Sequence, residues 1–326
     1  MSDEADLASL CELVQQHYGI SIVHKNSLGG ELDTNVYVRD GRGHEFTIKR
    51  SFCGDPAEVR WQYGVLQHLS ERLNGVAVPT LEKTQAGELD VVVPHLEGWL
   101  VIRLAHWVPG SIIGSLPSPT PNLLRQWGHL AANSVLALSD LPANQVPSTH
   151  HWDVRNSLVV IEECLGFVPD ESRKGAVRRI VDWADTAVAW LESQPCQVVH
   201  QDLNDFNVLV DEEGDRIVGL LDVGDAIYAP RISELVVASA YAMLRHSDVR
   251  HAFSQIVEGY TQILPLKGDE VSQVAKLAAL RLCVNATTWT MRDHVTGTEY
   301  GQRRMAATWP AIDALAKTIR RAPGIG

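Results

Sequence analysis

The chain has few cysteines, no excess of basic charge and no long apolar run, and each shortage excludes a class of protein. Its five cysteines form no Cys-x-x-Cys pair and no even framework, which favours reduced thiols over zinc or disulfide sites. With a net charge of −12, the chain lacks the basic surface that nucleic-acid binding ordinarily requires. No stretch is long enough to span a bilayer, and the acidic amino terminus does not have the form of a secretory signal. We therefore expect a cytoplasmic protein without a nucleic-acid or membrane partner.

Two sequence patterns are also absent. The chain has no Gly-x-x-x-x-Gly-Lys pattern, which disfavours a Walker-type nucleotide site, and it has no internal repeat. Its 326 residues, of which 45% are hydrophobic, suffice for about two lobes with a sizeable core. The acidic charge favours a small cationic or zwitterionic partner.

The stretch from His200 to Asn207 carries the strongest chemical signal in the chain. It reads His-Gln-Asp-Leu-Asn-Asp-Phe-Asn, which has the form His-x-Asp-x-x-x-x-Asn. Kinase-type enzymes use this spacing to present an aspartate to the acceptor hydroxyl and an asparagine to magnesium. In this interpretation Asp202 is the catalytic residue, which orients the hydroxyl and accepts its proton, while His200 supports the loop.

The residues that follow make this pattern more specific than a chance polar loop. Val208 to Val210, an acidic turn, and Ile217 to Leu221 predict a β-hairpin that ends in Leu-Asp-Val-Gly-Asp. Folding this hairpin places Asn207 beside Asp222. Amide and carboxylate oxygens are ligands that magnesium prefers, so we predict that these two residues bind the metal.

A second hairpin, over residues 36 to 49, supplies a cation for nucleotide phosphates. On its second strand Lys49 shares a face with Thr47, opposite the face of Phe46 and Ile48, so Lys49 points away from the core. The polar turn before the hairpin contains Gly29 and Gly30. Its backbone amides are candidates to cover phosphates, although the two glycines would serve equally well in an ordinary connection.

In this order, the motifs resemble the aminoglycoside phosphotransferase and choline kinase superfamily over nearly the whole chain. Several phrases are most similar to the hydroxylysine kinase branch: Val-Tyr-Val with Phe-Thr-Ile-Lys, Ile-Arg-Leu-Ala-His-Trp-Val-Pro-Gly, His-Trp-Asp-Val-Arg-Asn, and Asp-Leu-Asn-Asp. The resemblance implies an α+β, bilobal, protein-kinase-like fold with a small sheet-and-helix lobe and a mainly helical lobe. It also implies ATP with Mg²⁺ as cofactors, and GTP stays open.

The pattern along the chain predicts the two lobes, and the resemblance implies that the Pro-Gly turn between them is a hinge rather than a plain loop. We expect a nucleotide-binding lobe over residues 1–104, a hinge over 105–110, and a helical lobe over 111–326 that carries the catalytic loop and the acceptor site. Near the hinge, backbone groups around Leu104 and His106 are predicted to bond an adenine ring. The apolar spacing predicts helices over 5–17, 58–73, 123–138, 177–191, 233–244, 250–263 and 269–291.

Two positions depart from the family pattern. Many relatives pair the strand lysine with a glutamate on the next helix, but the matching residue here is Gln62. Glu58 lies one helical turn earlier, so we expect Gln62, Glu58 or both to hold Lys49. Val223 follows the metal aspartate where an aromatic residue is commoner, which affects packing more than chemistry.

Acceptor contacts are predicted at Asp153, Arg155, Asp225 and Arg281, which offer both signs of charge. The structural alternative for Asp153 and Arg155 together is a helix start, and Asp225 and Arg281 have alternatives of their own. Asp153 would also cap a helix, Asp225 would cap the next segment, and Arg281, on an apolar helix, would also pair with an internal acid.

The sequence thus predicts an ATP-dependent small-molecule kinase that phosphorylates a hydroxyl of a small amine or hydroxy amino acid. The alternatives are an aminoglycoside phosphotransferase, a choline, ethanolamine or homoserine kinase, and a non-catalytic nucleotide-binding pseudokinase. A protein kinase is disfavoured because a helix follows Asp225 too soon to leave room for a peptide-docking segment. The oligomeric state stays open.

Overall fold

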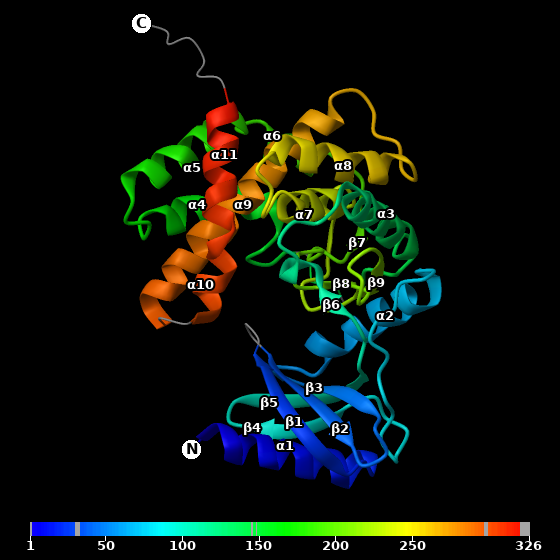
Figure 1. Ribbon diagram of the computed structural model, residues 1–326. Coiled ribbons are helices and arrows are strands. Elements are labelled where there is room, and N and C mark those ends of the chain that lie inside the picture. The colour runs from blue at the N-terminus through cyan, green and yellow to red at the C-terminus, as the bar shows by residue number, and fades with distance from the viewer. Residues whose placement is uncertain (1, 30–32, 145, 148, 297–298, 320–326) are drawn as a thin grey trace, which may run out of the picture. The chain divides into compact units, whose positions relative to one another are not determined.

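A computed structural model describes the chain except for residues 1, 30–32, 145, 148, 297–298 and 320–326. The chain divides into two compact units, Met1–Pro109 and Gly110–Gly326. Figure 1 shows that the first unit carries a sheet with helices and that the second is mainly helical.

The first unit is built on an antiparallel sheet with the strand order β1-β2-β3-β5-β4. Helix α1 packs on this sheet, and helix α2 connects β3 to the later strands. The bounds are α1 Ser2–Tyr18, β1 Ile22–Gly29, β2 Thr34–Asp40, β3 Glu45–Cys53, α2 Ala57–Arg72, β4 Val91–His95 and β5 Gly98–His106.

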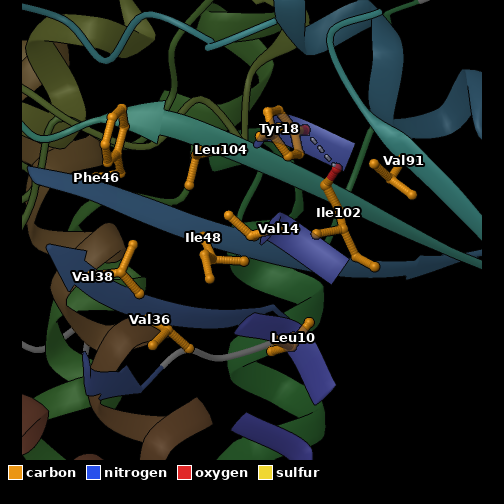
Figure 2. Close-up of a cluster of buried hydrophobic side chains, with 10 residues drawn as sticks. All are labelled: Leu10, Val14, Tyr18, Val36, Val38, Phe46, Ile48, Val91, Ile102 and Leu104. Carbon is orange, nitrogen blue, oxygen red and sulfur yellow. Dashed lines mark hydrogen bonds between the residues drawn. The ribbon is translucent and has the colours of Figure 1, made fainter. Parts of the chain in front are cut away.

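The β2–β3 hairpin forms because its turn residues favour a tight turn and because buried and more exposed residues alternate along its two strands. The Asp40 carboxylate accepts the backbone N–H groups of Arg42 and His44, each at 2.8 Å, and Gly43 takes the positive φ that the turn requires. Alternate strand residues then fall on one buried face. They pack with the apolar face of α1, as Figure 2 shows, in a core of Leu10, Val14, Tyr18, Val36, Val38, Phe46, Ile48, Val91, Ile102 and Leu104.

The second unit contains two small sheets, β10-β7 and β6-β8-β9, among helices. Its strands are β6 Ser111–Ile112, β7 Cys196–Val199, β8 Val208–Val210, β9 Ile217–Leu220 and β10 Ile227–Pro230. Its α-helices are α3 Pro121–Ala137, α4 Ser157–Leu165, α5 Glu171–Trp183, α6 Ala187–Glu192, α7 Ser233–Ala242, α8 Val249–Thr261, α9 Glu270–Thr296, α10 Glu299–Ala306 and α11 Thr308–Thr318, with short 3₁₀ turns at Ile113–Ser115 and Val154–Asn156.

Three features differ from the sequence prediction. Strand β5 continues through Ala105 and His106, which pair with Thr47 and Phe46 of β3, so the strand reaches into the predicted hinge. The helix predicted over 177–191 is two helices, α5 and α6. Helices α10 and α11 were not predicted. Among the described helices, none is long and apolar enough to cross a membrane.

Candidate active site

The predicted catalytic aspartate lies in a tightly bonded loop after β7. One Asp202 carboxylate oxygen accepts from Asn204 Nδ2 at 2.7 Å, and the other accepts from Asn207 Nδ2 at 2.6 Å. The Asp202 side chain is 16% exposed, so it keeps access to solvent. These two donors fix the plane of the carboxylate. A group that accepts a proton from a hydroxyl in one orientation requires such a fixed plane.

His200 supports this loop through contacts of both its ring nitrogens. It is fully buried, its Nδ1 accepts the Asp202 backbone N–H at 3.2 Å, and its Nε2 lies 3.2 Å from the carbonyl of Leu221. An accepting Nδ1 and a donating Nε2 define the neutral imidazole. Burial accordingly lowers the pKa of His200 to about 4. The ring therefore links the catalytic loop to the end of β9 without carrying charge.

Glu234, in the first turn of α7, anchors the start of the same loop. Its Oε1 accepts the backbone N–H groups of His200 and Gln201, and its side chain is fully buried. Gln201 has a φ of +65°, a conformation that needs external support in a residue other than glycine. Burial raises the pKa of Glu234 to about 8. Sequence reasoning missed this residue, although an acid within the apolar run of α7 was a visible signal.

The hairpin β8–β9 brings the two predicted metal ligands together. Val208 pairs with Leu220, and the Leu221 N–H donates to the Asn207 carbonyl at 2.8 Å, so Asn207 and Asp222 lie side by side. Asp222 has a φ of +55°, and its Oδ1 accepts the Gly224 N–H at 2.9 Å. Asn207 directs its amide nitrogen at Asp202, which leaves its oxygen for a cation. Two oxygen donors at this place fit a hard cation such as Mg²⁺.

Arg281 of α9 reaches the catalytic loop from the helical core. It is 2% exposed, and its Nη1 donates to the carbonyl of Trp152 at 2.7 Å, while its guanidinium lies over the indole of Trp152. Its Nη2 is 3.8 Å from Asp202 Oδ1. The internal acid expected beside Arg281 is thus Asp202, the predicted catalytic residue.

The other predicted acceptor residues contact each other or the backbone. Asp153 is buried, caps the turn that begins at Val154, and lies 2.6 Å from the Arg155 Nη2. Asp153 therefore caps this turn, as in the structural alternative to an acceptor contact. Asp225, partly buried, accepts from His150 through its backbone carbonyl at 2.7 Å.

In the first unit, Lys49 forms an ion pair with a residue that was not predicted as its partner. Its Nζ lies 3.0 Å from Oδ2 of Asp33. Gln62 accepts from Arg103 Nη1 at 2.8 Å, and Glu58 accepts the Asp55 N–H at 3.1 Å at the start of α2. Arg103, the partner of Gln62, lies directly across the sheet from Lys49, and the predicted hold of Gln62 or Glu58 on Lys49 stays a prediction.

The other described residues predicted to contact the nucleotide lie in strands of the first unit. The Leu104 carbonyl accepts from the Glu82 N–H at 2.8 Å, and the His106 N–H donates to the Thr80 carbonyl at 2.9 Å. These two groups are therefore engaged within the first unit, and the adenine contact around Leu104 and His106 stays a prediction. Gly29 ends β1 with a φ of +77°, and Gly30 lies outside the described residues.

The model of the phosphotransferase enzyme family matches residues 25–268, which include Lys49, the loop with Asp202 and the β8–β9 hairpin. The chain belongs to this family. It is a phosphotransferase, and the kinase activity predicted from the loop is confirmed at that level. The hydroxylysine kinase of Danio rerio is 24% identical over 85% of this chain and 81% of its own length. That of Mus musculus is 24% identical over 81% of this chain and 76% of its own.

Solved structures agree on the fold of the phosphotransferase. A microcompartment-associated aminopropanol kinase has a TM-score of 0.71 at 18% identity and covers 95% of this chain and 96% of its own. An amicoumacin kinase in complex with AMP-PNP and Ca²⁺ has a TM-score of 0.70 at 14% identity and covers 98% and 97%. The predicted α+β, protein-kinase-like fold class is confirmed.

Proposed function

We propose that the phosphotransferase transfers the terminal phosphate of ATP to the side-chain hydroxyl of a small hydroxylated amine, specifically a hydroxy amino acid of the hydroxylysine type. The observation that carries this proposal is the Asp202 carboxylate, which is held by two amides beside the Asn207–Asp222 pair. The proposed acceptor class, a hydroxy amino acid, is supported by the similarity of this chain to hydroxylysine kinases over most of its length.

Asp202 would act on the acceptor hydroxyl. The hydroxyl oxygen forms a bond to the terminal phosphorus, the bond from phosphorus to the bridging oxygen breaks, and ADP leaves with that electron pair. The proton of the hydroxyl passes to Asp202. Because Asn204 and Asn207 hold the carboxylate oxygens, little reorientation is needed when the acceptor arrives.

We propose the following side chains as the ones that hold the cofactors. Asn207 Oδ1 and the Asp222 carboxylate would bind Mg²⁺, which when bound neutralises phosphate charge. Lys49 would supply a cation to the phosphates from the first unit. Neighbouring structures bind ADP, AMP-PNP and GDP, so ATP is the proposed donor and GTP stays an alternative. The proposal places the enzyme in the cytoplasm, where ATP is available.

The acceptor would be recognised by groups of both signs in the second unit. Asp225 is proposed for an ammonium group, and Arg281, next to Asp202, for a carboxylate. Arg155 and Asp153 stay candidates only if the acceptor competes with their mutual ion pair. A carboxylate contact by arginine is directional, so it would hold the acceptor hydroxyl against Asp202.

Turnover of hydroxylysine, its decarboxylated analogue and kanamycin at matched concentrations tests this acceptor class. We expect hydroxylysine to be phosphorylated and the analogue to lose activity, because its carboxylate is missing. Equal turnover of the analogue, or preference for kanamycin, would contradict the hydroxy amino acid while leaving the kinase mechanism in place.

A further inference from the structure

Lys49 is bound by an acid from the turn that precedes β2. Its Nζ lies 3.0 Å from Oδ2 of Asp33, and the two side chains are 19% and 21% exposed. Both groups are thus partly shielded from water, and their attraction is stronger than that of a fully exposed pair. Any phosphate that binds Lys49 must compete with this carboxylate.

A second cation shares the same carboxylate. Arg103 of β5 is the cross-strand partner of Lys49, is 3% exposed, and has its Nη2 3.8 Å from Oδ2 of Asp33. Its other contacts are neutral, because Nη1 donates to Gln62 at 2.8 Å and Nη2 to Ser51 at 2.7 Å.

A buried guanidinium requires a negative charge nearby as well as hydrogen bonds. Among the described residues, Asp33 is the acid within 4 Å of Arg103. The next acid of this region, Asp90, is already bonded to Arg60 and to the hydroxyl of Tyr63. Asp33 is therefore the counter-ion of two cations at once. The guanidinium of Arg103 is fixed by its hydrogen bonds to Gln62 and Ser51, whereas the ammonium group of Lys49 lies at the end of a flexible side chain.

We propose that Asp33 and Arg103 form a counter-ion switch that sets how strongly Lys49 binds nucleotide phosphates. Asp33 neutralises Lys49 when no nucleotide is bound. When a triphosphate takes Lys49, Arg103 retains Asp33, so the carboxylate is not left without a partner. The proposal rests on the proposed nucleotide role of Lys49, and it gives the neutral Gln62 of α2 a role as an acceptor for Arg103.

Calorimetric titration of the full chain with ATP, ADP and adenosine, each with magnesium, tests the switch. Asp33→Asn should tighten ATP and ADP by roughly twofold to fivefold, because it removes the competing charge from Lys49. Adenosine has no phosphate, so its affinity should stay unchanged. Glu97→Gln removes one negative charge from the exposed β4–β5 turn of the same unit and serves as the matched control, with no effect expected.

A double-mutant cycle separates competition for Lys49 from simple repulsion of phosphate. In a Lys49→Met background Asp33→Asn should no longer tighten ATP, whereas repulsion alone would give the same gain with and without Lys49. Arg103→Met should weaken ATP, and adding Asp33→Asn should restore it, which a merely structural role of Arg103 would not produce.

Two results would overturn the proposal, and they are distinguishable. If Lys49→Met weakens ATP but Asp33→Asn does not tighten it, the switch fails and the nucleotide role of Lys49 stands. If Lys49→Met leaves ATP affinity unchanged, the proposed nucleotide role fails and the switch fails with it.

Discussion

At the scale of single residues, the site depends on side chains whose partners are supplied locally. Asp202 is held by Asn204 and Asn207 from its own loop, and Asp222 accepts the N–H of Gly224 just beyond it. Such contacts between residues that are close in sequence position the carboxylate oxygens of Asp202 and Asp222 within short segments of the chain.

Asp202→Asn should leave ATP affinity largely intact and lower phosphoryl transfer by about 10²- to 10⁴-fold, because a positioned base is lost. Steady-state kinetics together with calorimetric ATP binding would measure both effects. Glu213→Gln, an exposed change in the turn of the same hairpin, is the control and should be silent. Near-parental turnover of Asp202→Asn would show that Asp202 is not the base.

Asp222→Ala should abolish magnesium-dependent turnover, since Asn207 alone offers a single oxygen at that position. The measurement is turnover across a magnesium titration, with Glu212→Gln as the exposed control. Full activity of the variant at any magnesium concentration, or full activity of the parent in a chelator, would contradict the proposed metal site.

At the scale of elements, helices α3 and α8 cross at van der Waals contact through two glycines. A Cβ on Gly128 would lie 2.1 Å from the Ile256 carbonyl oxygen, and one on Gly259 would lie 2.0 Å from the Arg125 carbonyl oxygen. Both contacts are with backbone, which cannot give way as a flexible side chain would. The approach of these helices therefore depends on the absence of side chains.

Gly128→Ala should destabilise the protein by about 1–3 kcal/mol, because the added methyl group forces the two helices apart. Gly175→Ala is the matched control: a Cβ there would meet nothing within 4 Å, so the change should stabilise α5 by roughly 0.5–1 kcal/mol. Urea unfolding would compare the two, and a neutral Gly128→Ala would contradict the close crossing.

The anchor between α7 and the catalytic loop should make stability depend on pH. The pKa of Glu234 is raised from 4.5 to about 8 in the folded state, so its contribution is present below pH 4.5 and is lost as pH rises to about 8. The lowered pKa of His200 acts in the opposite direction, with stability lost as pH falls from 6.5 to about 4. The effect of Glu234 is therefore clearest above pH 6.5.

Glu234→Gln should remove a decline in unfolding free energy of up to about 1.4 kcal/mol per pH unit between pH 6.5 and 8. The nine tryptophans allow unfolding to be followed by fluorescence at each pH. The difference between variant and parent isolates Glu234 from other titrating groups. Identical pH slopes in the two proteins would contradict a buried, proton-binding Glu234.

The contrast between local and distant contacts explains what the sequence could predict. The β8–β9 hairpin and the Asn207–Asp222 pair were predictable because one short turn sets the register. The Gln62–Arg103 bond was not, because its partners are 41 residues apart and meet only once the sheet order is known. The pairing of Arg281 with Asp202 is similarly distant, and only the presence of a buried charge was visible beforehand.

At the scale of the whole molecule, the two units divide the predicted chemistry. The first unit holds Lys49 with its counter-ion Asp33 on an antiparallel sheet, and the second holds the predicted base, the predicted metal pair and the acceptor candidates. The family match spans parts of both units. Transfer of phosphate to a small acceptor should therefore be tested on the entire chain.

The most direct test is to identify the phosphorylated product. The full chain is incubated with magnesium and ATP labelled at its terminal phosphate, with either hydroxylysine or lysine, which lacks the hydroxyl. We predict that label appears on hydroxylysine as a phosphate ester, that lysine receives none, and that Asp202→Asn forms the ester at least about 10²-fold more slowly. Release of labelled inorganic phosphate alone, or equal labelling with lysine, would contradict the account.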